Sequence, residues 1–160
     1  MKLSIKSVTR GGIIAALYVV LTFVSAMFGL SSGVFQIRLS ESLCILAAFM
    51  PEAIGGLFVG CLIANLLTGA AIIDVIAGSL ATLLAAIGTY LLRKNRYLAV
   101  VPPIVVNAVI VSAVIHYAYM PSFALWKICL FVALGETVSA GILGQFVYEM
   151  IKRNMRFKNM

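Results

Sequence analysis

Three of the five acidic residues lie in one nearly apolar stretch, 34–84. Its polar residues inside apolar runs are Gln36, Arg38, Glu41, Glu52, Asn65 and Asp74. Ionisable groups inside membrane segments are costly. They usually face a bundle interior or a watery cavity, where they pair with one another or contact a substrate. This stretch therefore predicts a site that binds a small polar molecule.

The same residue types do not form a catalytic or metal-binding pattern. The sequence has no glycine-rich phosphate loop, no metal-ligand spacing and no nucleophile elbow. Cys44, Cys61 and Cys129 are isolated in apolar runs without zinc or redox spacing, so we interpret them as small helix-packing residues. We expect no enzymatic activity and no bound metal.

The composition indicates that lipid surrounds these residues. Of 160 residues, 63% are hydrophobic and 11% are charged, whereas a soluble domain has about 45–50% and about 25%. The mean hydropathy is +1.13. Because a helix needs about 20 apolar residues to cross a bilayer, residues 1–160 have room for five or six spans. We expect a single transmembrane domain.

Turn residues and proline divide the chain into six expected helical spans. They are residues 11–30, 39–50, 52–68, 71–92, 98–118 and 123–151. Pro51 followed by Glu52 predicts a helix start, since proline suits the first turn and an acid there complements the helix dipole. The second span is short for a crossing, and the sixth is long enough to tilt or protrude.

The basic residues predict the orientation. Ten of the twelve lie in three groups: Lys2, Lys6 and Arg10; Arg93, Lys94 and Arg96; Lys152, Arg153, Arg156 and Lys158. Six spans place all three groups on one side, which the positive-inside rule makes cytoplasmic. We expect an all-α membrane protein, a six-transmembrane-helix bundle of a bacterial cell membrane with both termini cytoplasmic. Charge that flanks spans does not indicate nucleic-acid binding.

Counting residues along the spans brings polar side chains of several helices to the outer half of the bundle. At about 1.5 Å of rise per residue, most of these polar side chains lie near the outer ends of their helices. Asn107 and Glu136 lie deeper and would form the floor of the same cavity. The predicted substrate-binding residues are Gln36, Arg38, Glu41, Asn65, Asp74, Asn107, Trp126 and Glu136. Phe35 and Trp126 are available to stack on a planar ring, which favours a heterocyclic ligand.

These residues also have structural interpretations that the sequence leaves open. Arg38 and Glu41 are spaced for an interfacial salt bridge, Asp74 for a helix cap, and Asn65 for an interhelical hydrogen bond. Trp126 fits an aromatic belt equally well. Glu52 falls on the cytoplasmic side, where we interpret it as a helix-start acid.

Two strips of small residues predict close helix contacts. Gly11 and Ala15, and likewise Gly12 and Ala16, are spaced four apart in the first span. Such spacing lets another helix approach closely. The strip serves either internal packing or contact with another subunit. The repeat of Gly56, Gly60 and Ala64 is interpreted as packing.

Three segments carry a family resemblance. They read Q-x-R-x-S-E-x-L, P-E-x-I-x-G-L-F-x-G-C-x-I-A-N and D-x-x-x-G-S-L-A-T-L-L-A, in this order after a basic N-terminus. The chain resembles the QueT family, the substrate-binding (S) components of energy-coupling factor (ECF) transporters linked to uptake of queuosine precursors. The resemblance covers essentially the whole chain and is strongest over residues 34–86.

The resemblance implies an S component that captures a queuosine precursor, a 7-deazaguanine, near the extracellular face. It implies a coupling subunit and two ABC ATPases as partners, which use the ATP, so the chain itself needs no cofactor. Gly11, Gly12, Ala15 and Ala16 match the family's coupling-subunit contact, and Glu41, Asp74 or Glu136 would read the ligand. The alternatives are an S component for another vitamin or nucleobase, a stand-alone ion-coupled secondary transporter, and an intramembrane enzyme or assembly subunit.

Overall fold

Every element in the described residues, 4–30 and 36–158 of the computed structural model, is helical. The elements are α1 (Ile5–Met27), η1 (Leu39–Ala48), α2 (Glu52–Leu67), α3 (Ile72–Leu91), α4 (Val101–Val114), η2 (Ile115–Tyr119), α5 (Leu125–Glu136), η3 (Thr137–Leu143) and α6 (Gly144–Lys158). The element η1 is a 3₁₀ helix, and η2 and η3 are π-helical. The helical fold class that the sequence predicts is confirmed.

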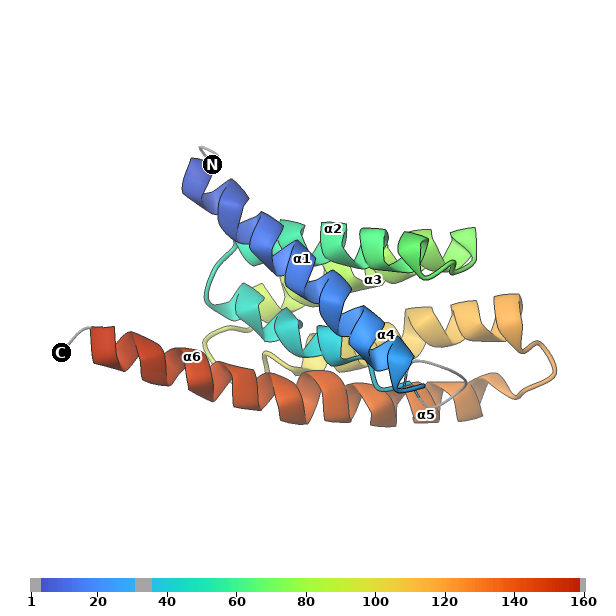
Figure 1. Ribbon diagram of the computed structural model, residues 1–160. Coiled ribbons are helices and arrows are strands. Elements are labelled where there is room, and N and C mark those ends of the chain that lie inside the picture. Colours follow the sequence, from blue (N-terminus) through green and yellow to red (C-terminus); the bar gives the residue numbers. More distant parts are fainter. Residues whose placement is uncertain (1–3, 31–35, 159–160) are drawn as a thin grey trace.

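Each of the six expected spans corresponds to one helical stretch. The fifth expected span is α4 continued by η2, and the sixth is α5, η3 and α6 in succession. The first helix begins at Ile5 rather than 11. It ends at Met27, shortly before Gly29, whose positive φ of 68° turns the chain. The last helix runs to Lys158 and protrudes beyond its neighbours (Figure 1).

Four of these stretches are long and apolar enough to cross a membrane. They are Ile5–Met27, Ile72–Leu91, Val101–Tyr119 and Leu125–Asn154. The remaining two, η1 and α2, are apolar but shorter. The helix count agrees with the sequence analysis, whereas six crossings and the side on which the termini lie stay predictions.

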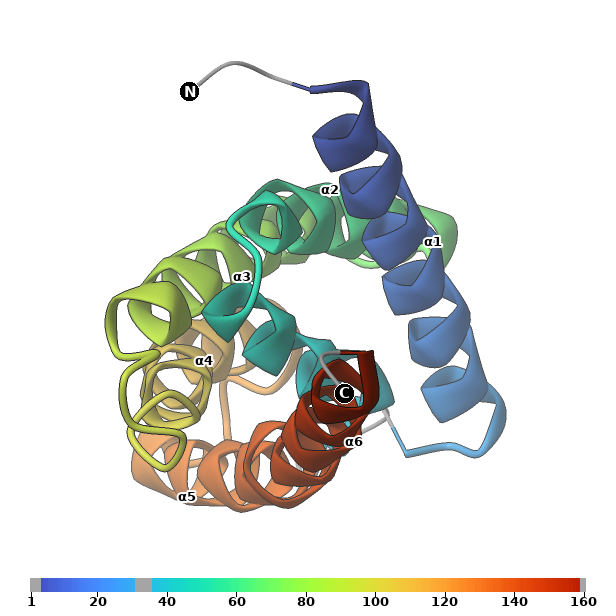
Figure 2. The ribbon, with the colours of Figure 1, turned by 90° about the vertical axis from the view of Figure 1, so that its left-hand side faces the viewer.

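The segment expected as the short second span is a buried 3₁₀ helix at the centre of the molecule. Residues 40–47 are all buried, and η1 packs against α1, α2, α3, η3 and α6. Figure 2 shows η1 inside the ring of the other helices. A 3₁₀ helix rises about 2.0 Å per residue, so ten residues span about 20 Å instead of the 15 Å of an α-helix. This extension lets a short segment line much of the interior.

The chain alternates between the two ends of the bundle. Both termini and the α3–α4 loop lie at one end, and the α2–α3 and η2–α5 turns lie at the other (Figure 1). Lys6 and Arg10 near the start of α1, the basic residues of the α3–α4 loop, and Lys152 and Arg153 in α6 therefore share one end. Arg38 and Lys127 lie toward the opposite end, as the sequence predicts.

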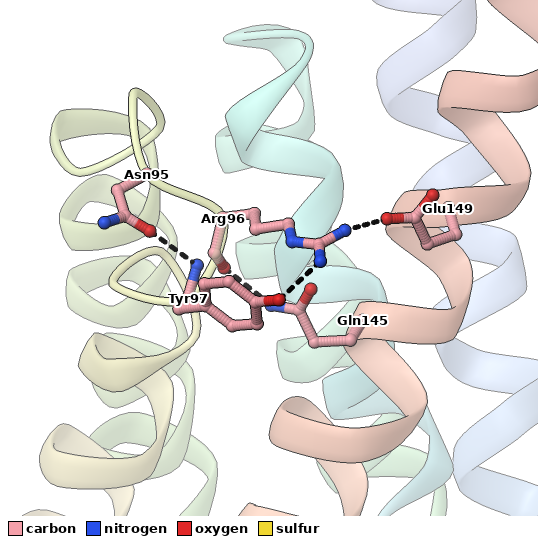
Figure 3. A network of polar contacts seen from close by, with 5 residues as sticks. All are labelled: Asn95, Arg96, Tyr97, Gln145 and Glu149. Carbon is pink, nitrogen blue, oxygen red and sulfur yellow. Dashed lines mark hydrogen bonds and ion pairs between the residues drawn. The ribbon is translucent and has the colours of Figure 1, made fainter.

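A polar network holds the α3–α4 loop to α6 at the terminal end. Arg96 forms an ion pair with Glu149 and a hydrogen bond with the Tyr97 hydroxyl (Figure 3). The Gln145 amide donates to the Arg96 carbonyl at 2.6 Å, and the Tyr97 N–H donates to Asn95 Oδ1 at 3.0 Å. Side chains of α6 therefore fix the position of this loop.

The helices α1 and α2 meet through glycines. A Cβ on Gly56 would lie 2.5 Å from the Gly11 carbonyl oxygen, and one on Gly60 would lie 2.9 Å from Ala15 Cα. At the start of this seam, Arg10 pairs with Glu52 at 3.0 Å. The Gly11–Ala15 half of the strip therefore serves internal packing.

We predict that Gly56→Ala loosens the α1–α2 seam. The added methyl would collide with the Gly11 backbone, and overpacking of this kind costs roughly 1–3 kcal/mol. Thermal unfolding of the purified protein in detergent should show a lower melting temperature. Gly55→Ala is the matched control, because Gly55 has open space at its Cβ position and its melting temperature should hold or rise. Equal stability of the two variants would contradict the seam.

Candidate functional site

A cavity of about 380 Å³ is lined in part by Ala70 and Met120, which belong to the two turns at the end of the bundle opposite the termini (Figure 1). Its volume is within the range of pockets that hold small molecules. The lining residues come from α1, α2, α3, α4, η2 and adjoining loops. They are Thr22, Ala26, Gln36, Arg38, Asn65, Thr68, Ala70, Asp74, Val111, Ile115, Tyr119 and Met120.

Arg38 supplies the positive charge of the cavity. It precedes η1 with an extended backbone, and its Nη2 donates to Asn65 Oδ1 at 2.7 Å. Its Nε is buried without a hydrogen-bond partner. An unpaired buried donor is costly, and an acceptor on a ligand, such as a ring carbonyl, would remove that cost.

Asn65 and Asp74 join α2 to α3 at the cavity wall. The Asn65 Nδ2 lies 3.5 Å from the Asp74 carbonyl oxygen. Gly78 leaves the room for this contact, since a Cβ there would lie 3.1 Å from Asn65 Nδ2 and 3.3 Å from Asp74 Oδ1. Asp74 is in the first turn of α3, where a negative charge complements the helix dipole. It is the carboxylate that lines the cavity.

Tyr119 holds this wall from the other side. Its hydroxyl donates to Asp74 Oδ2 at 3.4 Å and accepts from the Ala71 N–H at 3.0 Å. The sequence analysis did not select Tyr119, although its place near the outer end of the fifth span was a usable signal. It lies in the π-helical η2, and π-segments are frequent at functional sites.

Glu41 does not line the cavity, and its carboxylate is bound by other side chains of the protein. It is 2% exposed, accepts a hydrogen bond from the Tyr18 hydroxyl and contacts the Cys44 thiol at 3.2 Å. Cys44, expected only to pack, therefore also acts as a donor. The sequence analysis did not select Tyr18, the hydrogen-bond partner of Glu41.

The partners of η1 on α1 follow one helix face. Tyr18, Thr22 and Ser25 are spaced four and three apart and are all buried. Thr22 Oγ1 lies 2.9 Å from Ser40 Oγ, and Ser25 Oγ accepts from the Leu39 N–H at 2.9 Å. This spacing of polar residues was visible in the sequence and identifies the face of α1 that meets η1.

Glu136 is the second carboxyl beneath the cavity. It is 4% exposed, and its Oε2 has no hydrogen-bond partner. Asn107, Glu41 and Arg38 lie within interaction range of it. The preceding Gly135 touches the Gln36 backbone so closely that any Cβ would overlap the Gln36 carbonyl. The loop that lines the cavity therefore rests directly on α5 beside Glu136.

The eight predicted site residues thus separate into three groups. Gln36, Arg38, Asn65 and Asp74 line the cavity, and Glu41, Asn107 and Glu136 are buried outside that lining. Trp126 is not brought to the cavity: it is 66% exposed, and its ring lies 5.5 Å from the Lys127 ammonium. This position corresponds to the aromatic-belt alternative. The expected stacking residue Phe35 lies outside the described residues.

The structure also separates several structural alternatives. Arg38 pairs with Asn65, and the ion pairs in the described part of the chain do not join it to Glu41. The N-cap residue of α3 is Ala71, and Asp74 lies in the first turn rather than at the cap position. Glu52 begins α2 at the far end of the bundle, in agreement with the helix-start interpretation.

Comparison with known proteins identifies the family. Residues 8–153 match the family model described as QueT transporter. The chain belongs to the QueT transporter family. The QueT family is a family of transporters rather than enzymes, and the four membrane-length helical stretches fit a membrane protein of this family.

One curated relative adds detail to this assignment. It is the "Queuosine precursor transporter QueT" of Lactococcus lactis subsp. cremoris (strain MG1363), 42% identical over 71 residues. The match covers 44% of this chain and 41% of the relative's length. No solved structure matches the chain.

We predict that Tyr18→Phe destabilises the protein. The change removes the buried donor to Glu41 with almost no change of shape, and an unsatisfied buried group costs about 1–3 kcal/mol. Thermal or denaturant unfolding in detergent measures the loss. Tyr117→Phe is the control, because Tyr117 is 73% exposed. A Tyr18 variant as stable as the Tyr117 variant would show that the hydrogen bond contributes nothing.

Proposed function

We propose that this protein is the S component of an ECF-type ABC transporter and captures a queuosine precursor for ATP-driven uptake. The observation that carries the proposal is a polar cavity, lined by Arg38, Asn65 and Asp74, inside an apolar bundle of the QueT family. The relative's name supports the substrate class.

The cavity has the groups that a guanine-like ring requires. The Asp74 carboxylate can accept hydrogen bonds from a ring N–H and a neighbouring amine of a 7-deazaguanine. Arg38 Nε is a free donor for the ring carbonyl. Charge-assisted hydrogen bonds of this kind are short, directional and stronger than neutral ones. A ligand of this class would satisfy donor and acceptor groups on both sides of the cavity.

The distribution of charge supports capture from outside the cell. The basic groups share one end of the bundle, and the positive-inside rule makes that end cytoplasmic. The cavity then opens at the extracellular face. Residues 36–38, which rest on Gly135, line the cavity at this face.

Energy would come from partner subunits. Residues 1–160 contain no nucleotide-binding loop. A coupling subunit with two ABC ATPases would supply ATP-driven motion. Of the four residues expected at the coupling subunit, Gly12 and Ala16 are exposed, whereas Gly11 and Ala15 face α2.

Ligand binding by the purified chain tests the proposal. A panel of 7-deazaguanines should raise its melting temperature, and riboflavin, thiamine and biotin should not. A ligand at one hundred times its Kd stabilises by about 2.7 kcal/mol. Asp74→Asn should weaken binding by about tenfold to a hundredfold, because a hydrogen bond to a charged group contributes about 1.5–3 kcal/mol.

Glu149→Gln is the matched control, since Glu149 lies at the opposite end of the bundle. Stabilisation by a vitamin alone would favour an S component for another substrate. Uptake by this chain by itself, driven by an ion gradient, would favour a secondary transporter.

The exposed half of the small-residue strip generates a prediction about the partners. Gly12→Leu together with Ala16→Leu should prevent co-purification with the coupling subunit and ATPases, because bulky side chains keep helices apart. Binding of the ligand should persist. Gly55→Leu, which also adds bulk at an exposed glycine, should co-purify normally. Unimpaired assembly of the double variant would remove this strip from the interface.

A further inference from the structure

We propose that the α3–α4 loop and the end of α6 form a binding site for an anionic phospholipid. The site lies at the end of the bundle that carries both termini, away from the cavity (Figure 1). It gives the basic residues of this end a binding partner in addition to their role in orientation. The proposal does not depend on which ligand the cavity holds.

The charges at the terminal end do not balance within the protein. The lysines and arginines described at this end are Lys6, Arg10, Arg93, Lys94, Arg96, Lys152 and Arg153. Of the five acids of the chain, Glu52 and Glu149 lie here, and they pair with Arg10 and Arg96. The other cations of the loop and of α6 have no acid partner in the described part of the chain. An anion from outside the chain would balance their charge.

An ion pair gathers these cations on one side of the terminal end. The loop lies beside α6 because Arg96 pairs with Glu149 (Figure 3). Two exposed cations precede Arg96 within three residues, and two follow Glu149 within four, which is about one helical turn. They are Arg93, Lys94, Lys152 and Arg153. Clusters of about four to eight basic residues next to a membrane span are typical of anionic-lipid sites.

The length of the last helical stretch places its cations at the level of the lipid headgroups. From Trp126, exposed at the opposite end, about 20 residues cross the hydrocarbon core and reach Phe146. Lys152 and Arg153 follow about 9–10 Å further along the helix. Side chains on a helix lean toward its N-terminus, which for α6 is the direction of the membrane. Both cations can therefore reach back to a lipid phosphate.

The helix α3 gives the same level independently. Its 20 residues, Ile72–Leu91, match the thickness of the hydrocarbon core, and Arg93 follows two residues later. The cations of the loop and those of α6 thus lie at one depth. The anion that a membrane offers at this depth is the phosphate of a phospholipid.

Tyrosine rings accompany the cations on both elements. The Arg93 guanidinium lies 4.0 Å from the centre of the Tyr90 ring, and the Lys152 ammonium lies 5.8 Å from that of Tyr148. Tyrosine is enriched at membrane–water interfaces, where its ring is buried and its hydroxyl is hydrated. These pairs fit a face that meets lipid headgroups.

An exposed apolar strip on α6 distinguishes a lipid from an acidic protein as the occupant. Phe146, Met150 and Arg153 are spaced four and three apart, so they share one helix face, and all three are exposed. An acyl chain can lie along Phe146 and Met150 while Arg153 contacts the phosphate. A soluble acidic partner would dock beyond the headgroups and leave this strip uncovered.

Phosphatidylglycerol added to the purified full-length protein in a neutral detergent tests the site. It should raise the melting temperature, with half of the effect at a mole fraction about tenfold lower than phosphatidylcholine requires. Inorganic phosphate at matched ionic strength should not stabilise the protein, because it lacks the acyl chains that the strip would bind.

Two double variants with the same change of net charge locate the site. Lys152→Gln with Arg153→Gln should raise the required mole fraction of phosphatidylglycerol about tenfold. Lys6→Gln with Lys127→Gln is the matched control, since these exposed lysines lie on α1 and at the opposite end of the bundle. It should respond as the wild type does. The melting temperature without added lipid shows whether each variant is folded.

The alternative results each overturn the proposal. Equal responses to the two lipids would mean that the headgroup charge is not recognised. Equal losses in the two double variants would mean that net charge, rather than this face, attracts the lipid. Stabilisation by inorganic phosphate would assign the cations to a free anion. An unchanged lipid response, with loss of ATPase co-purification in the α6 variant, would assign the face to a protein partner.

Discussion

Burying a segment on all sides in an apolar bundle obliges every polar group on it to find its partner inside the protein. In this chain that segment is η1, whose residues 40–47 are all buried. The surrounding architecture meets this requirement mainly through α1. Its Tyr18, Thr22 and Ser25 face η1 and bond, in turn, to Glu41, Ser40 and the Leu39 backbone. The polar face of α1 and the buried η1 therefore depend on each other.

Glycines at helix contacts make this arrangement possible. The α1–α2 seam closes only because Gly56 and Gly60 have no Cβ to meet the α1 backbone. Gly135 performs the same role where the Gln36 backbone rests on α5. Close approach in lipid is stabilised by dispersion and hydrogen bonding rather than by the hydrophobic effect. The positions of these glycines thus decide how near the polar groups of separate helices come.

Hydropathy and turn residues were sufficient to predict the order and approximate limits of the helices, because length and apolarity are properties of a single segment. They did not predict that the second segment is a 3₁₀ helix. That choice depends on burial of η1 on all sides, which only its neighbours define. Likewise, the shared spacing of Gly11–Ala15 and Gly12–Ala16 could not show that α2 covers one pair and leaves the other exposed.

The site was predictable in depth but not in direction around each helix axis. Counting residues placed Arg38, Asn65 and Asp74 at one level, and the structure brings them to one cavity. The same counting placed Trp126 at that level too, yet it faces outward. Depth follows from rise per residue, whereas direction follows from which face packs inward. In α5, apolar side chains occur on every side of the helix, so the sequence pattern does not show which face packs inward. Glu136 is the residue that indicates the inward face. The buried Glu136 and its neighbour Gly135, which touches the Gln36 backbone, mark the inward face of α5, and Trp126 lies on an exposed face.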